Sequence, residues 1–262
     1  MSIYKKEEGK VAIVTGGGSG IGRAAALAFA KEGIRVCVMD VKEERAEEVA
    51  EEIKDSGGEA MAAEIDVSNS HEVQRGIEQA VQKWGRLDVL FANAGINGTL
   101  APIENLSIEE WNTTISTNLN GTFLAVKHAI PYMKKAGGSI VITSSINGNR
   151  KFHGFGMAAY SSSKAAQVAF MKMAALELAR YKIRVNAICP GAINTNIGEN
   201  TDATEAVKEI TIPVNYPEGN QPLEHKPGEP EQVADLVLFL ASERSSHITG
   251  TEIYIDGAET LL

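Results

Sequence analysis

Runs typical of β-strands alternate with runs typical of α-helices along the whole chain, and this alternation restricts the fold more than any other feature. The expected strands, each a short apolar run, are residues 10–15, 35–40, 60–66, 87–92, 139–143, 184–188 and 251–256. Strands that alternate with helices form a parallel sheet whose two faces are covered by those helices. We therefore expect an α/β fold with a single doubly wound, parallel, seven-stranded sheet.

Helices are expected between these strands, where apolar residues recur at intervals of three or four. One of them is indicated by an apolar stripe from Val73 to Trp84. The next begins at Ser107, which together with Glu110 has the spacing of a capping box. The other expected helices are residues 21–30, 43–54, 161–180 and 231–241.

No linker, composition break or internal repeat divides the chain, so residues 1–262 are interpreted as one domain. The irregular stretch 194–230 is rich in proline. A long segment of this kind inside a compact domain is more often functional than a domain boundary, so we expect a lid there. Ile212, Val214 and Tyr216 offer the lid apolar contacts, while its glutamates weakly disfavour anionic substrates.

Composition excludes several classes of protein. Hydrophobic residues make up 44% and charged residues 23% of the chain, as in globular proteins that bury a sizeable core. The net charge of −9 argues against a nucleic-acid partner, which needs a basic face. No apolar run approaches the roughly 18 residues that span a bilayer, and none precedes the first strand as a signal core, so no membrane partner is expected. Cys37 and Cys189 lie in apolar runs and are expected to be buried free thiols in a cytoplasmic protein.

A glycine-rich loop lies between the first expected strand and the first expected helix, with the sequence TGGGSGIG at 15–22. Glycines permit a tight turn and a close approach of backbone to a pyrophosphate, and the helix N-terminus offers free N–H groups to the phosphates. The spacing of Gly16, Gly20 and Gly22 differs from the GxGxxG dinucleotide fingerprint. The position of the loop after the first strand nevertheless favours a dinucleotide site on a Rossmann-like sheet.

Asp40 ends the second expected strand, at the place where a carboxylate can accept hydrogen bonds from the adenosine ribose and repel a 2′-phosphate. Residue 19 is a serine and not a basic residue, so nothing nearby is obviously suited to hold that phosphate. The alternative is a solvated aspartate at the end of a strand. The pattern favours NAD over NADP.

Tyr160 and Lys164 are four residues apart on an expected helix, so both side chains project from one face. An ammonium group beside a phenol stabilises the phenolate. Lowering the pKa of a tyrosine from near 10 to about 7 requires roughly 4 kcal/mol, which a lysine and a positive nicotinamide can supply in a dry site. Such a pair is common on helices and has weight only beside other motifs. No HExxH motif, cysteine cluster or Gly-x-Ser-x-Gly elbow points to a metal or a hydrolase.

Six motifs occur in the order of one known family. They are TGGGSGIG, Asn93-Ala-Gly95 in FANAG, Asn118 in NLNG, Ser145 in ITSSING, YSSSK at 160–164 and Pro190-Gly191. By these motifs residues 10–257 resemble the short-chain dehydrogenase/reductase family. The resemblance implies a nicotinamide-dependent oxidoreductase.

The resemblance also implies a role for each matched catalytic residue. Tyr160 would be the general acid/base, and Lys164 would lower its pKa and hold the nicotinamide ribose. Ser145 would orient the substrate oxygen, and Asn118 would support a water that relays protons through Lys164. The family's S-x-x-G pattern selects Ser145, with Gly148, over the preceding serine.

The cofactor contacts follow from the same resemblance. Asp66 and Val67 match the adenine contact, and Asn93 matches the residue that supports the sheet beside the cofactor. The residues implied for cofactor binding are Gly16, Ser19, Gly20, Ile21, Asp40, Asp66, Val67, Asn93, Gly95, Tyr160, Lys164, Pro190, Ile193 and Thr195.

Two departures from the family pattern concern loops. The gap between Ser145 and Tyr160 is longer than is common, and the extra length falls at 149–157, a loop that either shapes the substrate pocket or is a surface excursion. DGAE stands at 256–259, where the family often has a second glycine. Neither departure removes a residue that the chemistry needs.

We therefore expect a single NAD-binding catalytic domain with a lid at 194–230, which transfers a hydride between NAD and a small secondary alcohol or its ketone without a metal. One alternative is a 3-ketoacyl-carrier reductase that uses NADPH, against which Asp40 argues. Another is a non-catalytic NAD-sensing protein on the same fold, which would be expected to lose a catalytic tyrosine or lysine.

The expected helix 161–180 is apolar on more than one side. The residues expected to face the sheet are Ala165, Val168, Ala169 and Leu176, and those expected on the other side are Ala166, Phe170 and Met173. A helix that is apolar nearly all round must bury both sides. We expect a homotetramer arranged as a dimer of dimers, because closed two-fold symmetry is the usual arrangement. The alternative is that the lid covers the second side.

Overall fold

The structure, a computed structural model, describes residues 9–152 and 154–262. Its central sheet has seven strands in the order β3-β2-β1-β4-β6-β7-β9, and every neighbouring pair is parallel. The strands are β1 (Val11–Thr15), β2 (Arg35–Asp40), β3 (Ala60–Glu64), β4 (Val89–Ala92), β6 (Gly138–Thr143), β7 (Ile183–Pro190) and β9 (Glu252–Ile255). The predicted doubly wound, parallel, seven-stranded sheet is confirmed.

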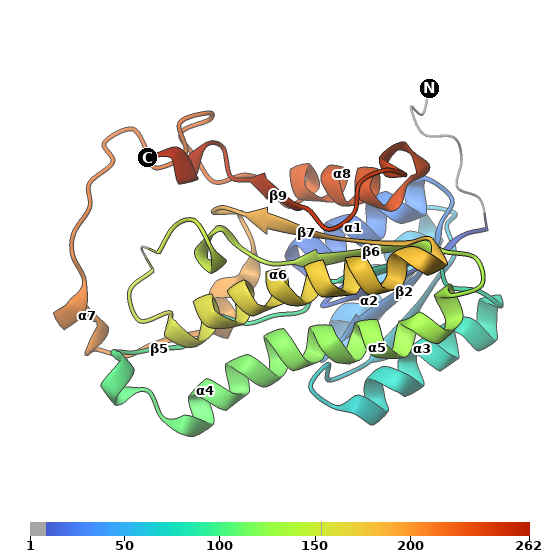
Figure 1. The fold of residues 1–262 in the computed structure, drawn as a ribbon, viewed down its shortest axis with the longest axis horizontal. Coiled ribbons are helices and arrows are strands. Elements are labelled where there is room, and N and C mark those ends of the chain that lie inside the picture. Colours follow the sequence, from blue (N-terminus) through green and yellow to red (C-terminus); the bar gives the residue numbers. More distant parts are fainter. Residues whose placement is uncertain (1–8, 153) are drawn as a thin grey trace.

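Helices cover both faces of this sheet (Figure 1). One layer contains α1 (Gly20–Lys31), α2 (Glu43–Asp55) and α8 (Pro230–Ala241), and the other contains α3 (Ser70–Trp84), α4 (Ile108–Ile115), α5 (Gly121–Met133) and α6 (Ala158–Leu178). Each face has its own buried apolar cluster. Ile13 and Leu90 belong to the cluster beneath α3, α5 and α6, whereas Val14 and Phe91 belong to the one beneath α1, α2 and α8. Successive strand residues therefore serve opposite faces, as the strand period of two requires.

β1 lies between β2 and β4. From β1 the chain adds β2 and β3 on one side and then crosses back to add β4 on the other side, so the strand order reverses at β1. In an open α/β sheet, the crevice outside the carboxyl ends of the strands at such a switch point is where ligands bind. β1 ends at Thr15 and α1 begins at Gly20, so the glycine-rich sequence 15–22 forms the turn between them and the first residues of the helix. The strand order thus places this loop at the mouth of the crevice.

A two-stranded parallel sheet, which was not predicted, joins the lid to the body of the protein. It pairs β5 (Gly98–Leu100), in the loop after β4, with β8 (Thr201–Ala203). Each strand has three residues, too few to produce a recognisable period. The lid also contains a short 3₁₀-helix, η5 (Asn196–Asn200), and the short helix α7 (Val207–Ile210). The stretch interpreted as irregular therefore has regular structure of its own.

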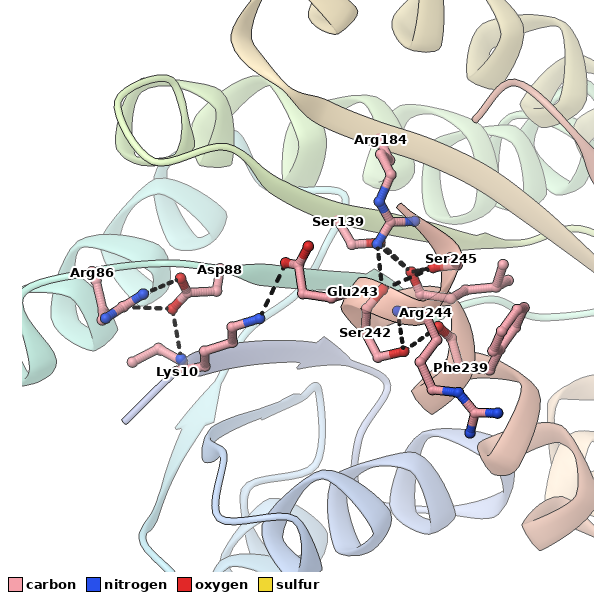
Figure 2. A network of polar contacts seen from close by, with 12 residues as sticks. Lys10, Arg86, Asp88, Ser139, Arg184, Phe239, Ser242, Glu243, Arg244 and Ser245 are labelled. Atoms are coloured by element: carbon pink, nitrogen blue, oxygen red, sulfur yellow. Dashed lines mark hydrogen bonds and ion pairs between the residues drawn. The ribbon is translucent and has the colours of Figure 1, made fainter. Parts of the chain in front are cut away.

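A polar network occupies the amino-terminal end of the sheet, opposite the switch-point crevice (Figure 2). The carboxylate of Asp88 accepts hydrogen bonds from the backbone N–H of Val11 (2.9 Å) and from two nitrogens of Arg86 (2.8 and 2.6 Å). The Arg184 guanidinium donates to the carbonyl of Leu240 at the end of α8 (2.8 Å). These charged groups hold the start of β1 and the end of α8 in place, and they lie outside the crevice.

Helix α6 turns a different side to the sheet than its sequence suggested. Of the residues expected to face the sheet, Val168 is buried and Ala165 is half-buried, but Ala169 and Leu176 are exposed, so the prediction is wrong for these two. The residues of its second half that are buried instead are Met171, Ala174, Ala175 and Leu178. Because α6 is apolar nearly all round, its sequence does not define which side points inward.

The outward side of α6 carries exposed apolar side chains. Leu176 is 73% exposed and Met173 is 56% exposed, so the lid does not cover them. Beside them the ring of Phe123, from α5, meets the ring of Phe170 edge to face, with centroids 6.1 Å apart. Figure 1 shows α5 and α6 running side by side on this surface.

Cys37 and Cys189 are buried free thiols, as predicted. Burial raises the pKa of Cys37 to about 12 and that of Cys189 to about 11, so neither is a reactive thiolate near neutral pH. In the described part of the chain, no group of three histidine, cysteine or acidic side chains is placed to hold a metal ion. Within the same residues, no helix is both long and apolar enough to cross a bilayer.

Candidate active site

A pocket of about 650 Å³ opens at the carboxyl ends of the central strands. The predicted site residues that line it are Gly16, Ser19, Gly20, Ile21, Asp40, Asp66, Val67, Asn93, Gly95, Ser145, Tyr160, Lys164, Pro190, Ile193 and Thr195. Asn118 is the one predicted site residue that does not line this pocket. The motifs named from the sequence thus converge on one cavity, whose volume is in the range of ligand-binding pockets.

The glycine-rich loop leaves room for a ligand's phosphates because side chains are excluded from it. Gly16 has φ of 61°, in the left-handed region, and a Cβ there would lie 2.9 Å from the Cα of Ala94. A Cβ on Gly22 would overlap the carbonyl of Gly16. Ser19 is the N-cap of α1 but makes no side-chain cap hydrogen bond, so the first N–H groups of the helix stay available at the pocket. The loop therefore fits a pyrophosphate.

Asp40 is buried at the end of β2, with 9% of its surface exposed. One carboxylate oxygen accepts from the backbone N–H of Gly18 (3.0 Å) and the other from the backbone N–H of Lys42 (3.1 Å). These two bonds hold the carboxylate between the glycine-rich loop and the start of α2. In this position the carboxylate can meet the hydroxyls of a ribose.

Two cations that the expectation from the sequence did not include lie at the same end of the pocket. Lys42 and Arg45 both line the cavity beside Asp40. The guanidinium of Arg45 pairs with Glu199 of the lid, with Nη2 and Oε2 2.6 Å apart. This hydrogen bond raises the pKa of Arg45 and lowers the pKa of Glu199. The two basic residues follow Asp40 within five positions and were visible in the sequence, whereas the pairing of Arg45 with Glu199 was not.

Asn93 ties together the ends of three strands at the floor of the pocket. Its side-chain N–H groups donate to the carbonyls of Thr15 (3.2 Å) and Gly16 (3.3 Å), at the end of β1. Its amide oxygen accepts from the hydroxyl of Thr143, at the end of β6 (3.0 Å). This arrangement agrees with a supporting role beside a cofactor.

The two adjacent serines after β6 have different partners. The Ser144 hydroxyl donates to the backbone carbonyl of Lys164 (2.8 Å) and so holds α6 against β6. The Ser145 oxygen accepts from the backbone N–H of Asn147 (3.1 Å) and is hydrogen-bonded to the phenol of Tyr160. Ser145, which the S-x-x-G pattern selects, is thus the serine next to the phenol.

Tyr160 and Lys164 lie in the first turns of α6, and both are buried. Nζ of Lys164 is 5.5 Å from the centre of the Tyr160 ring and donates to the carbonyl of Thr143 (2.8 Å). Burial lowers the pKa of Lys164 to about 8. Burial also raises the pKa of Tyr160, and the hydrogen bond with Ser145 opposes that rise only in part. The side chains alone therefore do not produce the lowered tyrosine pKa that the sequence suggested, because desolvation of the phenolate outweighs the hydrogen bond.

Asn118 is fully buried in a π-helical turn between α4 and α5. Its amide donates to the carbonyl of Ile96 (2.9 Å) and to the hydroxyl of Ser163 (3.0 Å), and its oxygen accepts from the N–H of Ile96 (2.9 Å). A Cβ on Gly95 would lie 3.2 Å from this oxygen and 3.4 Å from Nζ of Lys164. Asn118 thus joins the loop after β4 to α6. The missing side chain of Gly95 leaves room for the ammonium of Lys164 beside Asn118.

The opposite end of the pocket contains a buried carboxylate that the sequence analysis missed. Glu259 is 2% exposed and accepts hydrogen bonds from the N–H of Ala192 (3.0 Å) and the amides of Asn220 (2.9 Å) and Gln221 (3.2 Å). Its backbone carbonyl accepts from the ammonium of Lys151 (2.9 Å). It joins the C-terminal segment, the lid, the turn after β7 and the loop before α6. No sequence motif identifies this residue, because its hydrogen-bond partners come from separate segments of the chain.

The role of the loop 149–157 was left open by the sequence, and among its described residues one, Met157, lines the pocket. Asn149, at its start, is hydrogen-bonded to Glu252 of β9. Met157, at its end, lines the cavity. His153 lies outside the described residues. The loop is therefore anchored at the edge of the sheet and contributes an apolar side chain to the pocket.

Residues near the two ends of the lid, such as Thr195 and Asn220, line the pocket. Ile212 and Val214 are 67% and 61% exposed and do not line the cavity, so the apolar contacts expected from them are not made. Tyr216 is half-buried, and its ring centroid is 5.3 Å from Nζ of Lys151.

Comparisons with known proteins agree with this geometry. The family described as enoyl-(acyl carrier protein) reductase matches residues 16–258. A cyclohexanol dehydrogenase from Acinetobacter sp. (strain SE19) is 37% identical over 259 residues, which cover 98% of each chain. The solved structure of a 3-ketoacyl-ACP reductase from Sinorhizobium meliloti 1021 has a TM-score of 0.93 and 49% identity, covering 96% of this chain and 99% of that one. That of a 3-ketoacyl-(acyl-carrier-protein) reductase from Brucella melitensis, complexed with NADH, has a TM-score of 0.84 and 31% identity, covering 97% and 99%.

Proposed function

Because this chain belongs to the short-chain dehydrogenase/reductase family of oxidoreductases, which bind a nicotinamide cofactor, we propose that it transfers a hydride between NAD and a secondary alcohol or its ketone. The observation that carries the proposal is that Ser145, Tyr160 and Lys164 line the same pocket as the glycine-rich loop and Asp40. Residues 1–262 would form one catalytic domain, with the lid at 194–230 beside the pocket.

When bound, the nicotinamide would supply the site that accepts or donates the hydride. In the oxidation direction, the phenolate form of Tyr160 would take the hydroxyl proton of the alcohol, and in reduction the phenol form would give its proton to the ketone oxygen. The hydroxyl of Ser145, already hydrogen-bonded to the phenol, is placed to hold the substrate oxygen. The ammonium of Lys164 stabilises the anionic form of Tyr160 and is within reach of a ribose. Asn118 holds the loop after β4 through the carbonyl of Ile96. Gly95 in that loop has no side chain, which leaves room for the ammonium of Lys164.

A panel assay tests this function. The protein is mixed with NAD and secondary alcohols, or with NADH and ketones that include a 3-ketoacyl thioester, and the absorbance of reduced nicotinamide is followed. Turnover of alcohols or simple ketones supports the proposal. Tight NADH binding without turnover of any substrate would instead favour the NAD-sensing alternative.

A second candidate is a 3-ketoacyl-carrier reductase, and the 49% identity to a 3-ketoacyl-ACP reductase of Sinorhizobium meliloti favours it. The buried carboxylate of Asp40 argues against the 2′-phosphate of NADPH. Reduction of the 3-ketoacyl thioester alone, with NADPH as the better cofactor, would favour this candidate.

The unmodified protein is expected to use NADH with a kcat/KM at least about tenfold above that for NADPH, because the Asp40 carboxylate would repel a 2′-phosphate. Asp40→Asn keeps the size of the side chain, removes its charge and is expected to narrow this ratio. Steady-state rates with each cofactor measure it. Asp202→Asn, at an exposed position of β8, is the control. Equal or better use of NADPH by the unmodified protein would contradict the proposal.

We also propose a homotetramer in which α5 and α6 form one of the interfaces. Met173 and Leu176 expose apolar surface on α6, and Phe123 exposes 45% of its surface on α5. Contiguous exposed apolar side chains on a helix pair are typical of a protein interface. A second copy related by two-fold symmetry would cover the same surface on both chains.

Met173→Glu combined with Leu176→Glu is expected to dissociate the assembly into smaller species, because both charges would be buried in the interface. Size exclusion coupled to light scattering measures the mass, and circular dichroism checks that the exposed substitutions leave the fold intact. Ile212→Glu, at a similarly exposed position of the lid, is expected to leave the mass unchanged. A stable 28.0 kDa species of the unmodified protein would refute the tetramer.

A further inference from the structure

Arg45 and Asp40 flank the same point of the glycine-rich loop. A Cβ built on Gly18 would lie 2.6 Å from the Cβ of Arg45 and 2.9 Å from a carboxylate oxygen of Asp40. Both residues line the pocket, and 28% of the Arg45 side chain is exposed. A positive guanidinium therefore borders the place where Asp40 would meet the adenosine ribose.

A segment of the lid brings a negative charge to this guanidinium from 154 residues away. One oxygen of Glu199 lies 2.6 Å from Nη2 of Arg45, and the other accepts a hydrogen bond from the amide of Asn196 (2.8 Å). At the start of the same segment Thr195 stands against the loop, 3.2 Å from where a Cβ on Gly20 would be. The segment thus runs from the N-terminus of α1 to the start of α2, along the end of the pocket proposed for the cofactor.

We propose that Glu199 is a specificity-determining residue that withholds Arg45 from the 2′-phosphate of NADP. This inference rests on the proposed nicotinamide function of the pocket. The planar guanidinium of arginine is a strong partner of phosphate, and an arginine near the ribose accommodates the 2′-phosphate in proteins that bind NADP. Here an N–H group of Arg45 donates to a carboxylate instead.

Glu199 acts through Arg45, because its carboxylate offsets the charge of the guanidinium and occupies one of its N–H groups. Partly exposed ion pairs are weak, so removing this pair is expected to have a modest effect on cofactor affinity. Without the Glu199 charge, the carboxylates that still act on Arg45 are those of Asp40 and Glu48, and the guanidinium can offer an N–H group to a 2′-phosphate. We expect Glu199→Gln to shift the ratio of NADPH to NADH affinity by about 3- to 10-fold toward NADPH.

Fluorescence titration of NADH and NADPH against the cofactor-free protein tests this inference without a substrate. Glu199→Gln and Glu199→Ala are both measured, each alone and combined with Arg45→Gln. The shift toward NADPH is expected in both single variants of Glu199 and is expected to vanish when Arg45 is also replaced. The control is Glu205→Gln, which removes the same charge from an exposed lid glutamate paired with Lys208.

An unchanged affinity ratio in both Glu199 variants would overturn the inference, and so would a shift that persists without Arg45. A shift of equal size in Glu205→Gln would mean that the overall charge of the lid is responsible, which also overturns it. These outcomes differ from a failure of the proposed function. If the unmodified protein already prefers NADPH, the NAD assignment fails, while the change caused by Glu199→Gln still decides the role of Glu199.

Discussion

Tyr160→Phe is expected to lower kcat by about 10²–10⁴-fold, the contribution typical of a positioned acid/base group, while the Kd for NADH changes by less than about threefold. The substitution keeps the aromatic ring, which is 8% exposed on α6, and deletes the hydroxyl that is hydrogen-bonded to Ser145. Single-turnover rates and NADH fluorescence titration measure the two quantities separately.

The matched control is Tyr181→Phe, just beyond the far end of α6, where the ring of Tyr181 lies 4.9 Å from Nζ of Lys134 and outside the pocket. This variant is expected to keep most of the activity. If Tyr160→Phe retained more than roughly a tenth of the activity, Tyr160 would not be the general acid/base that transfers the proton of the substrate hydroxyl.

Lys164→Met is expected to lower kcat/KM by at least about 10²-fold, because the ammonium that stabilises the tyrosine anion is removed. Lys172→Met is the control on the same helix. Its ammonium pairs with Glu252 at 2.6 Å, and 54% of the side chain is exposed. Activity within about threefold of the unmodified protein in Lys164→Met would contradict the role assigned to this lysine.

Lys164→Met is also expected to change how the free energy of unfolding depends on pH. Burial lowers the pKa of Lys164 from 10.5 to about 8, so between these values the unfolded chain binds more protons than the folded protein. The free energy of unfolding of the cofactor-free protein should therefore rise with pH in this window, relative to Lys164→Met, by at most about 1.4 kcal/mol per pH unit. Urea unfolding from pH 7 to 10 measures the difference. A difference between the two proteins that falls or stays flat as pH rises would contradict it.

Several parts of the site were predictable because they are encoded locally. The motifs TGGGSGIG, FANAG and YSSSK each follow or begin a regular element, so strand order brings them to one end of the sheet. The choice between the serines at 144 and 145 followed from the S-x-x-G spacing, and Ser145 is the one beside Tyr160. The pKa of Tyr160 was not predictable in this way, because it depends on how far the fold removes the phenol from water.

The sequence by itself determined the seven strands, the helices between them and the residues of the motifs that line the pocket, because hydrophobic period and motif spacing are properties of short segments. Only the tertiary structure decided which side of α6 is buried, because a helix that is apolar nearly all round has no preferred inward side. It also decided the pairing of Arg45 with Glu199 and the burial of Glu259 beside Asn220. The residues of each pair belong to different segments of the chain, and no local pattern records which distant side chain the fold will bring to meet them.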